Sequence, residues 1–264
     1  MALFKSGNPA LTKDTFKEIE KVEKGSTDVM TLQGTVNKTA ILLFAVLVPA
    51  IYTWNLFTST LDFATIAPYF WTGTFGGLIL SFVIVFNKDW SPYLAPIYSI
   101  LQGFCLGGLS AAMNHKFPGI VMQALLLTFG ICAVLLVIYK LKIIKPTENF
   151  KLIVASATGG LALYYLASIG LSFAGIELPF IHENTTGGII FSLFAVILAA
   201  MNLVVDFDFI ENGAESRAPK YMEWYGAFGL MVTIIWLYVE ILRLLAKSRK
   251  KRNPTQGKIE HPTK

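Results

Sequence analysis

The chain is a series of long apolar runs separated by short polar connections. Seven runs are long enough to cross a hydrocarbon layer of about 30 Å, which takes roughly 20 residues in a helix. The interiors of the first six contain no Asp, Glu, Lys or Arg. Continuous runs, rather than ten-residue alternation, favour helices over a barrel, because every backbone amide must be paired within lipid. We predict spans at 39–58, 68–86, 93–113, 118–139, 152–174, 186–206 and 223–246.

This pattern predicts an all-α membrane protein, a bundle of seven transmembrane helices, in three parts. Residues 1–38 form a cytoplasmic N-terminal segment, residues 39–246 the transmembrane domain, and residues 247–264 a basic, disordered tail. Within the first part, residues 12–24 have apolar side chains at helical spacing, so they form either an amphipathic helix on the membrane surface or a solvated tail.

Composition narrows the class of protein. Hydrophobic residues make up 54% of the chain, charged residues only 15%, and the mean hydropathy is +0.58. Soluble domains carry about 25% charged residues, and disordered chains are poor in apolar residues, so both classes are excluded. The net charge of +5 comes from Lys and Arg between and beyond the apolar runs, so we expect no nucleic-acid partner. Cys105 and Cys132 lie in apolar runs, as reduced packing residues do.

The distribution of Lys and Arg predicts the orientation. With seven spans, nearly all of these residues before Arg243 fall on the face of the N-terminus, and Lys116 alone falls on the other. The positive-inside rule therefore places the N-terminus in the cytoplasm. The basic residues from Arg243 onward would then lie outside, so either the tail is translocated or a late segment is re-entrant. The length of residues 223–246 favours seven full spans.

Small residues in the spans predict close helix packing. Gly73 with Gly77 and Gly103 with Gly107 form G-x-x-x-G pairs, which let helix backbones approach. Catalytic signatures such as a P-loop, H-E-x-x-H or G-x-S-x-G are missing from the sequence. We therefore expect no enzyme and no cofactor.

The end of the sixth span carries the candidate chemistry. Asp206 and Asp208 directly follow the apolar run, at an expected helix C-terminus, where carboxylates oppose the helix dipole. Either both have merely reached the interface, or they form a cluster that responds to protons or cations, with Asp206 the deeper group. Glu223 begins the next span on the same face, so antiparallel packing would bring it near them. Asp206 and Asp208 are also the candidate metal ligands.

Further polar residues lie within the last two spans. Glu240 is about 25 Å from Glu223 by helical rise, and its expected partner is Arg243, one turn on. Asn202 is expected to form a hydrogen bond between helices.

Several strings of residues resemble the Bax inhibitor-1 (YccA-like) family, in its bacterial branch. The strongest are APKYMEWYGAFG at 218–229, WLYVEILRLL at 236–245 and VDFDFIE at 205–211; others are SGNPAL at 6–11, MTLQGTVNKT at 30–39 and SPYLAP at 91–96. The resemblance covers essentially the whole chain.

The resemblance implies a seven-helix bundle with the last helix near its centre. It also implies a pH-sensitive calcium leak, in which aspartates on helices six and seven sense protons. The sixth-helix aspartate corresponds to Asp206 or Asp208, and the seventh-helix position falls near Thr233, which is no acid. The second span also lacks the basic residue that some relatives place there.

Two functions of different classes follow. The first is a passive, pH-modulated cation leak for Ca²⁺, gated near Asp206, Asp208 and Glu223, in the inner membrane of a bacterium. The second is a membrane protein that regulates a membrane protease or a stress response through its N-terminal segment. A small-molecule transporter is less favoured, because the chain shows no inverted repeat.

Overall fold

In a computed structural model of the chain, the described residues, 28–144, 146–173, 175 and 185–252, are almost entirely helical. The amphipathic stretch expected at 12–24 and most of the expected tail lie outside these residues. A single isolated bridge pairs Val29 with Pro219. The long helices are α2 (Leu32–Thr60), α3 (Phe63–Phe86), α4 (Ser91–Lys116), α5 (Ile120–Lys140), α6 (Glu148–Phe173), α7 (Thr186–Glu215) and α8 (Met222–Arg252), with a short 3₁₀ helix η1 (Lys88–Trp90) before α4.

The seven predicted spans are confirmed: within the described residues, seven helices are long and apolar enough to cross a membrane. Most boundaries differ by only a few residues, but α2 begins at Leu32, seven residues before the predicted start, within the predicted N-terminal segment. Helix α7 runs to Glu215 and α8 to Arg252. The expected end of the sixth span at 206 was therefore wrong by more than two turns. The expected start of the disordered tail at 247 was wrong as well, since residues 247–252 are helical.

Local capping explains several helix starts. The side chains of Thr31, Asp62 and Thr185 each accept a hydrogen bond from a backbone N–H in the first turn of α2, α3 and α7, respectively. Such side chains satisfy N–H groups that have no partner within the helix. Pro92 lies at the start of α4, where a missing N–H costs nothing.

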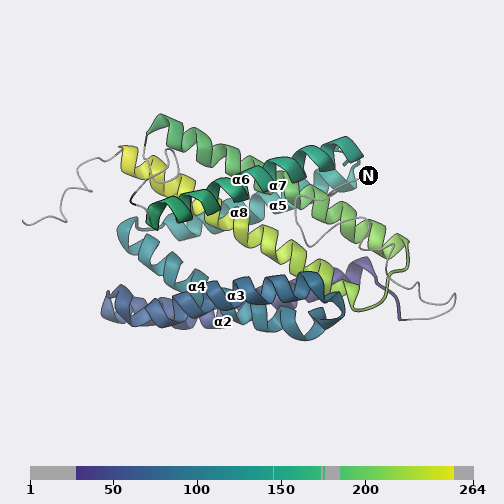
Figure 1. The fold of residues 1–264 in the computed structure, drawn as a ribbon, viewed down its shortest axis with the longest axis horizontal. Helices are drawn as coiled ribbons and strands as arrows, with labels where there is room; N and C mark the ends of the chain where they lie inside the picture. The colour runs from purple at the N-terminus through teal and green to yellow at the C-terminus, as the bar shows by residue number, and fades with distance from the viewer. Residues whose placement is uncertain (1–27, 145, 174, 176–184, 253–264) are drawn as a thin grey trace, which may run out of the picture.

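The bundle has two ends, which we call the N face and the C face. The N face holds the starts of α2 and α8, together with the end of α7, and the C face holds the end of α8. Figure 1 shows α2, α3 and α4 side by side on one side of the molecule, with α8 running obliquely between them and the other helices. Helix α8 packs against α2, α4, α5 and α7, so the last helix is central, as the family resemblance implied.

The predicted glycine pairs bring three helices together. A Cβ added to Gly103 would lie 2.3 Å from the backbone oxygen of Val46, and one added to Gly107 would lie 2.2 Å from that of Ala50. Both contacts join α4 to α2. Gly73 lies equally close to the backbone of α4. Glycine is required here because any side chain would separate the helices.

Candidate functional site

Asp206 lies deep inside the bundle. Its exposed fraction is 0%, and α7 continues for nine further residues to Glu215, a rise of about 14 Å. The expectation that Asp206 stands at a helix C-terminus was therefore wrong, and the argument from the helix dipole does not apply to it. The carboxylate lies on a continuous helix within the protein core, where ionisable residues are costly and mark functional positions.

Asp208 lies two residues closer to the N face and has a different environment. It forms an ion pair with Lys151 of α6, whose side chain is 5% exposed, whereas Asp208 is 19% exposed. Beside Asp208 is a cavity of about 560 Å³ whose walls include Tyr139, Lys142 and Glu211. Tyr139 donates a hydrogen bond to Glu211. A cavity lined mostly by polar residues therefore reaches Asp208 and Glu211 near the N-face end of α7.

Glu223 belongs to a different cluster. Its carboxylate is 0% exposed and forms ion pairs with Lys38 of α2 and, at 2.9 Å, with Lys220. It also accepts hydrogen bonds from the backbone N–H of Thr31 at 2.9 Å and from the Thr31 hydroxyl at 2.7 Å. We call Thr31, Lys38, Lys220 and Glu223 the N-face cluster. It fastens the start of α8 to the start of α2.

The backbone around the N-face cluster is fitted to the buried carboxylate. A Cβ added to Gly34 would lie 2.1 Å from Oε1 of Glu223, so a side chain there would displace the carboxylate from its place against α2. The backbone N–H of Met30 donates to the carbonyl of Ala218 at 2.7 Å, which holds the entry to α2 against the α7–α8 connection. Burial, and then the charge of Asp89, raise the pKa of Tyr221 in that connection.

The register of α7 against α8 places Thr233. Gly226 lies beside Ile210, and the rings of Phe209 and Tyr225 are 6.2 Å apart. Because the two helices are antiparallel, Asp206 of α7 lies level with the residue of α8 about four positions after Gly226. Thr233 lies about one turn beyond that level, toward the C face. Thr233 is 2% exposed, and its hydroxyl donates to the carbonyl of Gly229 within its own helix. The position holds a buried hydroxyl group in place of an acid.

The comparison with known families decides the identity. The sequence model of the family described as Bax inhibitor 1 like matches residues 8–250, nearly the whole chain. The chain belongs to the Bax inhibitor 1 like family. Searches of the curated proteins and of the solved structures gave no match.

This Bax inhibitor 1 like protein does not bring the three predicted carboxylates together. Asp206 is in the core, Asp208 pairs with α6, and Glu223 pairs with the start of α2. Within the described ranges, no group of three or more His, Cys, Asp or Glu side chains could hold a metal ion. The prediction that Glu223 would lie beside Asp206 or Asp208 is replaced by its place in the N-face cluster.

Asn202 and Glu240 are buried polar residues that lie farther from the N face than Asp206. Asn202 donates to the Thr158 hydroxyl at 2.8 Å, which confirms the expected hydrogen bond between helices. Glu240 pairs with Arg243 at 3.1 Å, as the spacing predicted. Sequence reasoning missed Tyr165, whose hydroxyl donates to Glu240 at 3.0 Å from α6. Tyr165 is seven residues, or about two helical turns, after Thr158, and this spacing could have indicated that both lie on the same face of α6.

Proposed function

We propose that the protein is a pH-modulated cation leak whose cargo is Ca²⁺, and that Asp206 is its proton-sensitive group. The observation that carries this proposal is the complete burial of the Asp206 carboxylate in the core of the bundle, on the helix that also lines the polar cavity. Protonation would remove a negative charge from the interior and change how α7 packs. Such a local charge change biases an element with two arrangements.

The surroundings of Asp206 support a path for cations from the N face. Asp208 and Glu211 line the cavity at that end of α7, and carboxylate oxygens are the ligands that Ca²⁺ prefers. Asp208 is held by Lys151, so a cation arriving from the cavity competes with a lysine for this carboxylate. Asp206 is the next acid inward along α7.

Flux measurements test this function. Purified protein in liposomes should admit Ca²⁺ at rates that differ among pH 6, 7 and 8. In Asp206→Asn the amide cannot change charge, so the ratio of the rates at pH 6 and pH 8 should fall to about 1. Asp62→Asn is the matched control, because Asp62 is exposed at the start of α3, and it should keep the wild-type ratio. Rates equal to those of empty liposomes at every pH would rule out the leak.

We also propose that the protein lies in the inner membrane of a bacterial cell, with its N face toward the cytoplasm. The short connections support this orientation: Lys88, Lys140 and Lys142 lie on the N face and Lys116 on the C face. An impermeant thiol reagent added to whole cells should label Lys116→Cys and should label Lys88→Cys only after permeabilisation. The reverse pattern would invert the orientation. Cys105 and Cys132 are replaced with alanine in both variants.

One observation favours a second function, regulation through the N-terminal segment. The Val29–Pro219 bridge fastens residues 28–31 to the α7–α8 connection, and Thr31 fastens them to Glu223 in the first turn of α8. Any partner that pulls on residues 1–27 therefore acts on the start of α8. Deletion of residues 1–26 removes the segment and keeps the N-face cluster. A leak should survive this deletion, whereas binding to a membrane protease should not.

A further inference from the structure

Three polar side chains of α6 lie on one face of the helix, at intervals of seven residues. They are Lys151, Thr158 and Tyr165, and we call them the α6 polar face. A seven-residue interval is close to two full turns, with a drift of only about 20°, so the three side chains form a line along the helix. Polar residues on the inward side of a membrane helix are costly unless they are paired or functional.

Each member of the α6 polar face contacts a polar side chain of α7 or α8. Lys151 pairs with Asp208 near the N face, and Thr158 accepts from Asn202 in the middle. Near the C face, Tyr165 donates to Glu240 and accepts from Arg243. Polar contacts are therefore spaced along the inner side of α6 from one end of the helix toward the other.

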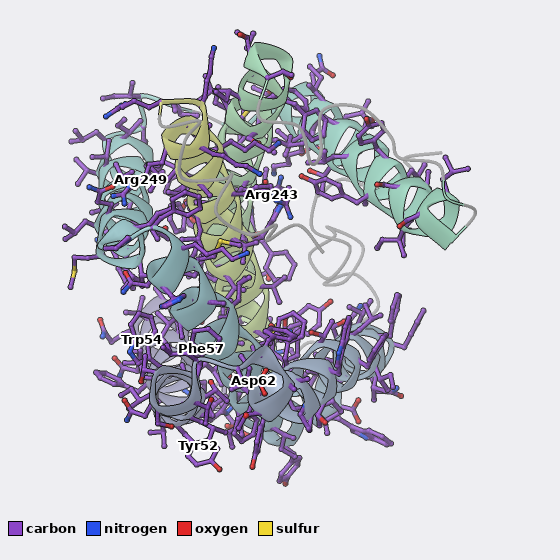
Figure 2. All side chains as sticks on the ribbon, turned by 90° about the vertical axis from the view of Figure 1, so that its left-hand side faces the viewer. Tyr52, Trp54, Phe57, Asp62, Arg243 and Arg249 are labelled. Atoms are coloured by element: carbon purple, nitrogen blue, oxygen red, sulfur yellow. The ribbon has the colours of Figure 1, made fainter. Side chains whose placement is uncertain are left out.

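Helix α6 is otherwise loosely held. It packs mainly along α7, and in Figure 2 it stands apart from α2, α3 and α4. Gly159, Gly160 and Gly170 have no atom within 4 Å of where a Cβ would be, so the outer side of α6 makes no close contact within the described protein. Separating α6 from the bundle opens the apolar cluster that Val154 and Leu161 form with α7, and it breaks the three polar contacts as well.

The contact nearest the C face joins a buried acid to a cation on the same helix. Glu240 is 1% exposed, and both of its oxygens are contacted by the single nitrogen Nη1 of Arg243, at 3.1 and 3.2 Å. The Arg243 side chain is 34% exposed, and its guanidinium lies 5.1 Å from the ring of Tyr165. Figure 2 shows Arg243 on the side of α8 that is turned toward α6.

This geometry suits a replaceable partner. A single-nitrogen contact lacks the second parallel hydrogen bond of the strong bidentate arrangement. Arg243 is three residues from Glu240 and partly exposed, so its side chain can turn away without any movement of the backbone. The buried carboxylate would then keep its hydrogen bonds from Tyr165 and Trp236 through Oε1, while Oε2 would lose the contact with Arg243 and could accept another cation.

Building on the proposed leak, we propose that cations cross the protein along the α6 polar face. Glu240 is the carboxylate that binds the cation near the C face. When the path is closed, the guanidinium of Arg243 occupies this carboxylate as a tethered cation. The ligand is an inorganic cation, and Ca²⁺ alone is the probe. To open the path, α6 would move away from α7 and α8 and break its three polar contacts, and Arg243 would leave Glu240.

Neutralising Arg243 tests the tethered cation. Arg243→Gln should raise Ca²⁺ flux into liposomes about threefold to fivefold, because the lost ion pair is partly exposed and of moderate strength. Glu240→Gln should lower flux below the wild-type rate. Arg249→Gln is the control, since Arg249 lies on the same helix and contacts Pro118 and Gln123 instead. Equal flux in Arg243→Gln and Arg249→Gln would overturn the role of Arg243.

A cross-link tests the path without removing the buried acid. In a chain with Cys105 and Cys132 replaced by alanine, Thr158→Cys and Asn202→Cys are joined by a short thiol-specific cross-linker. The cross-link should stop flux, and cleavage by a reducing agent should restore it. Either single cysteine, treated alike, shows the effect of the attached reagent alone, and the cross-linked protein should lose more flux than either of them. Flux that continues through the cross-linked protein would overturn the path along α6.

A labelling experiment separates this inference from the proposed leak. The rate at which an impermeant thiol reagent modifies Thr158→Cys is measured in Arg243→Gln and in Arg249→Gln. Faster modification in Arg243→Gln supports an α6 path whether or not Ca²⁺ moves through it. Wild-type flux with equal modification rates would leave the leak in place and refute the path. Absent wild-type flux would refute the leak itself.

Discussion

Replacing Glu223 with alanine is expected to destabilise the protein by about 3–5 kcal/mol, the cost of breaking a buried ion pair by removing one partner. The carboxylate is fully buried, and the Lys38 side chain that pairs with it is only 17% exposed. Without Glu223 the lysine remains at the protein interior with no opposite charge, and the backbone N–H of Thr31 loses its acceptor. Lys220 contributes less, because 42% of its side chain is exposed. Thermal or SDS-induced unfolding in detergent measures the loss.

Two variants make this prediction specific. Glu148→Ala removes an acid that is 49% exposed and 3.8 Å from Lys151, and it should cost no more than about 1 kcal/mol. Glu223→Gln keeps the shape and one oxygen that can accept from Thr31, so its loss should be intermediate. If Glu223→Ala were no more damaging than Glu148→Ala, the N-face cluster would not hold α2 to α8.

Gly107→Ala is expected to destabilise the protein by about 1–3 kcal/mol, the usual cost of overpacking a close contact. The added Cβ would lie 2.2 Å from both the backbone oxygen of Ala50 and the hydroxyl oxygen of Thr53. Backbone atoms cannot move aside as the end of a flexible side chain can, so α2 and α4 must separate. The effect opposes the gain of about 1 kcal/mol in helix propensity that alanine brings over glycine.

The same substitution in α6 isolates the packing effect. Gly159 has nothing within 4 Å of an added Cβ, so Gly159→Ala should leave stability unchanged or raise it slightly. Both variants gain the same helix propensity. The difference between their unfolding midpoints therefore measures only the cost of the clash between the added Cβ of residue 107 and α2. Equal midpoints would mean that the close approach of α2 and α4 contributes nothing to stability.

The helices were predictable because every span must be a long apolar run to cross the hydrocarbon layer. Apolar length alone located all seven helices, and the glycine spacing indicated where α4 meets its neighbours. The i,i+3 spacing of Glu240 and Arg243 also predicted their pairing, since contacts within one helix follow from its geometry. These features depend on local sequence, and each of them is confirmed.

The surroundings of the carboxylates were not predictable in the same way. The predicted end of α7 is wrong because the acids at 206–211 look like the end of an apolar run. Asp206 is in fact buried in the core, and Asp208 pairs with Lys151 of α6. Lys38 lies before the predicted start of its span, in the segment predicted to be cytoplasmic. Its pairing with Glu223 depends on which helix ends meet in space, and neither local periodicity nor composition encodes that.

The contact between Thr31 and Glu223 also bears on how the protein is made. The two residues are 192 positions apart, and chains are synthesised from the N-terminus. Lys38 therefore reaches the membrane while its counter-charge is still unsynthesised, and it stays uncompensated until the first turn of the last helix arrives. The start of α2 is therefore fastened only when the last helix has been made. A nascent chain that stops before Met222 has Lys38 without Glu223, and this unpaired lysine distinguishes it from the finished protein.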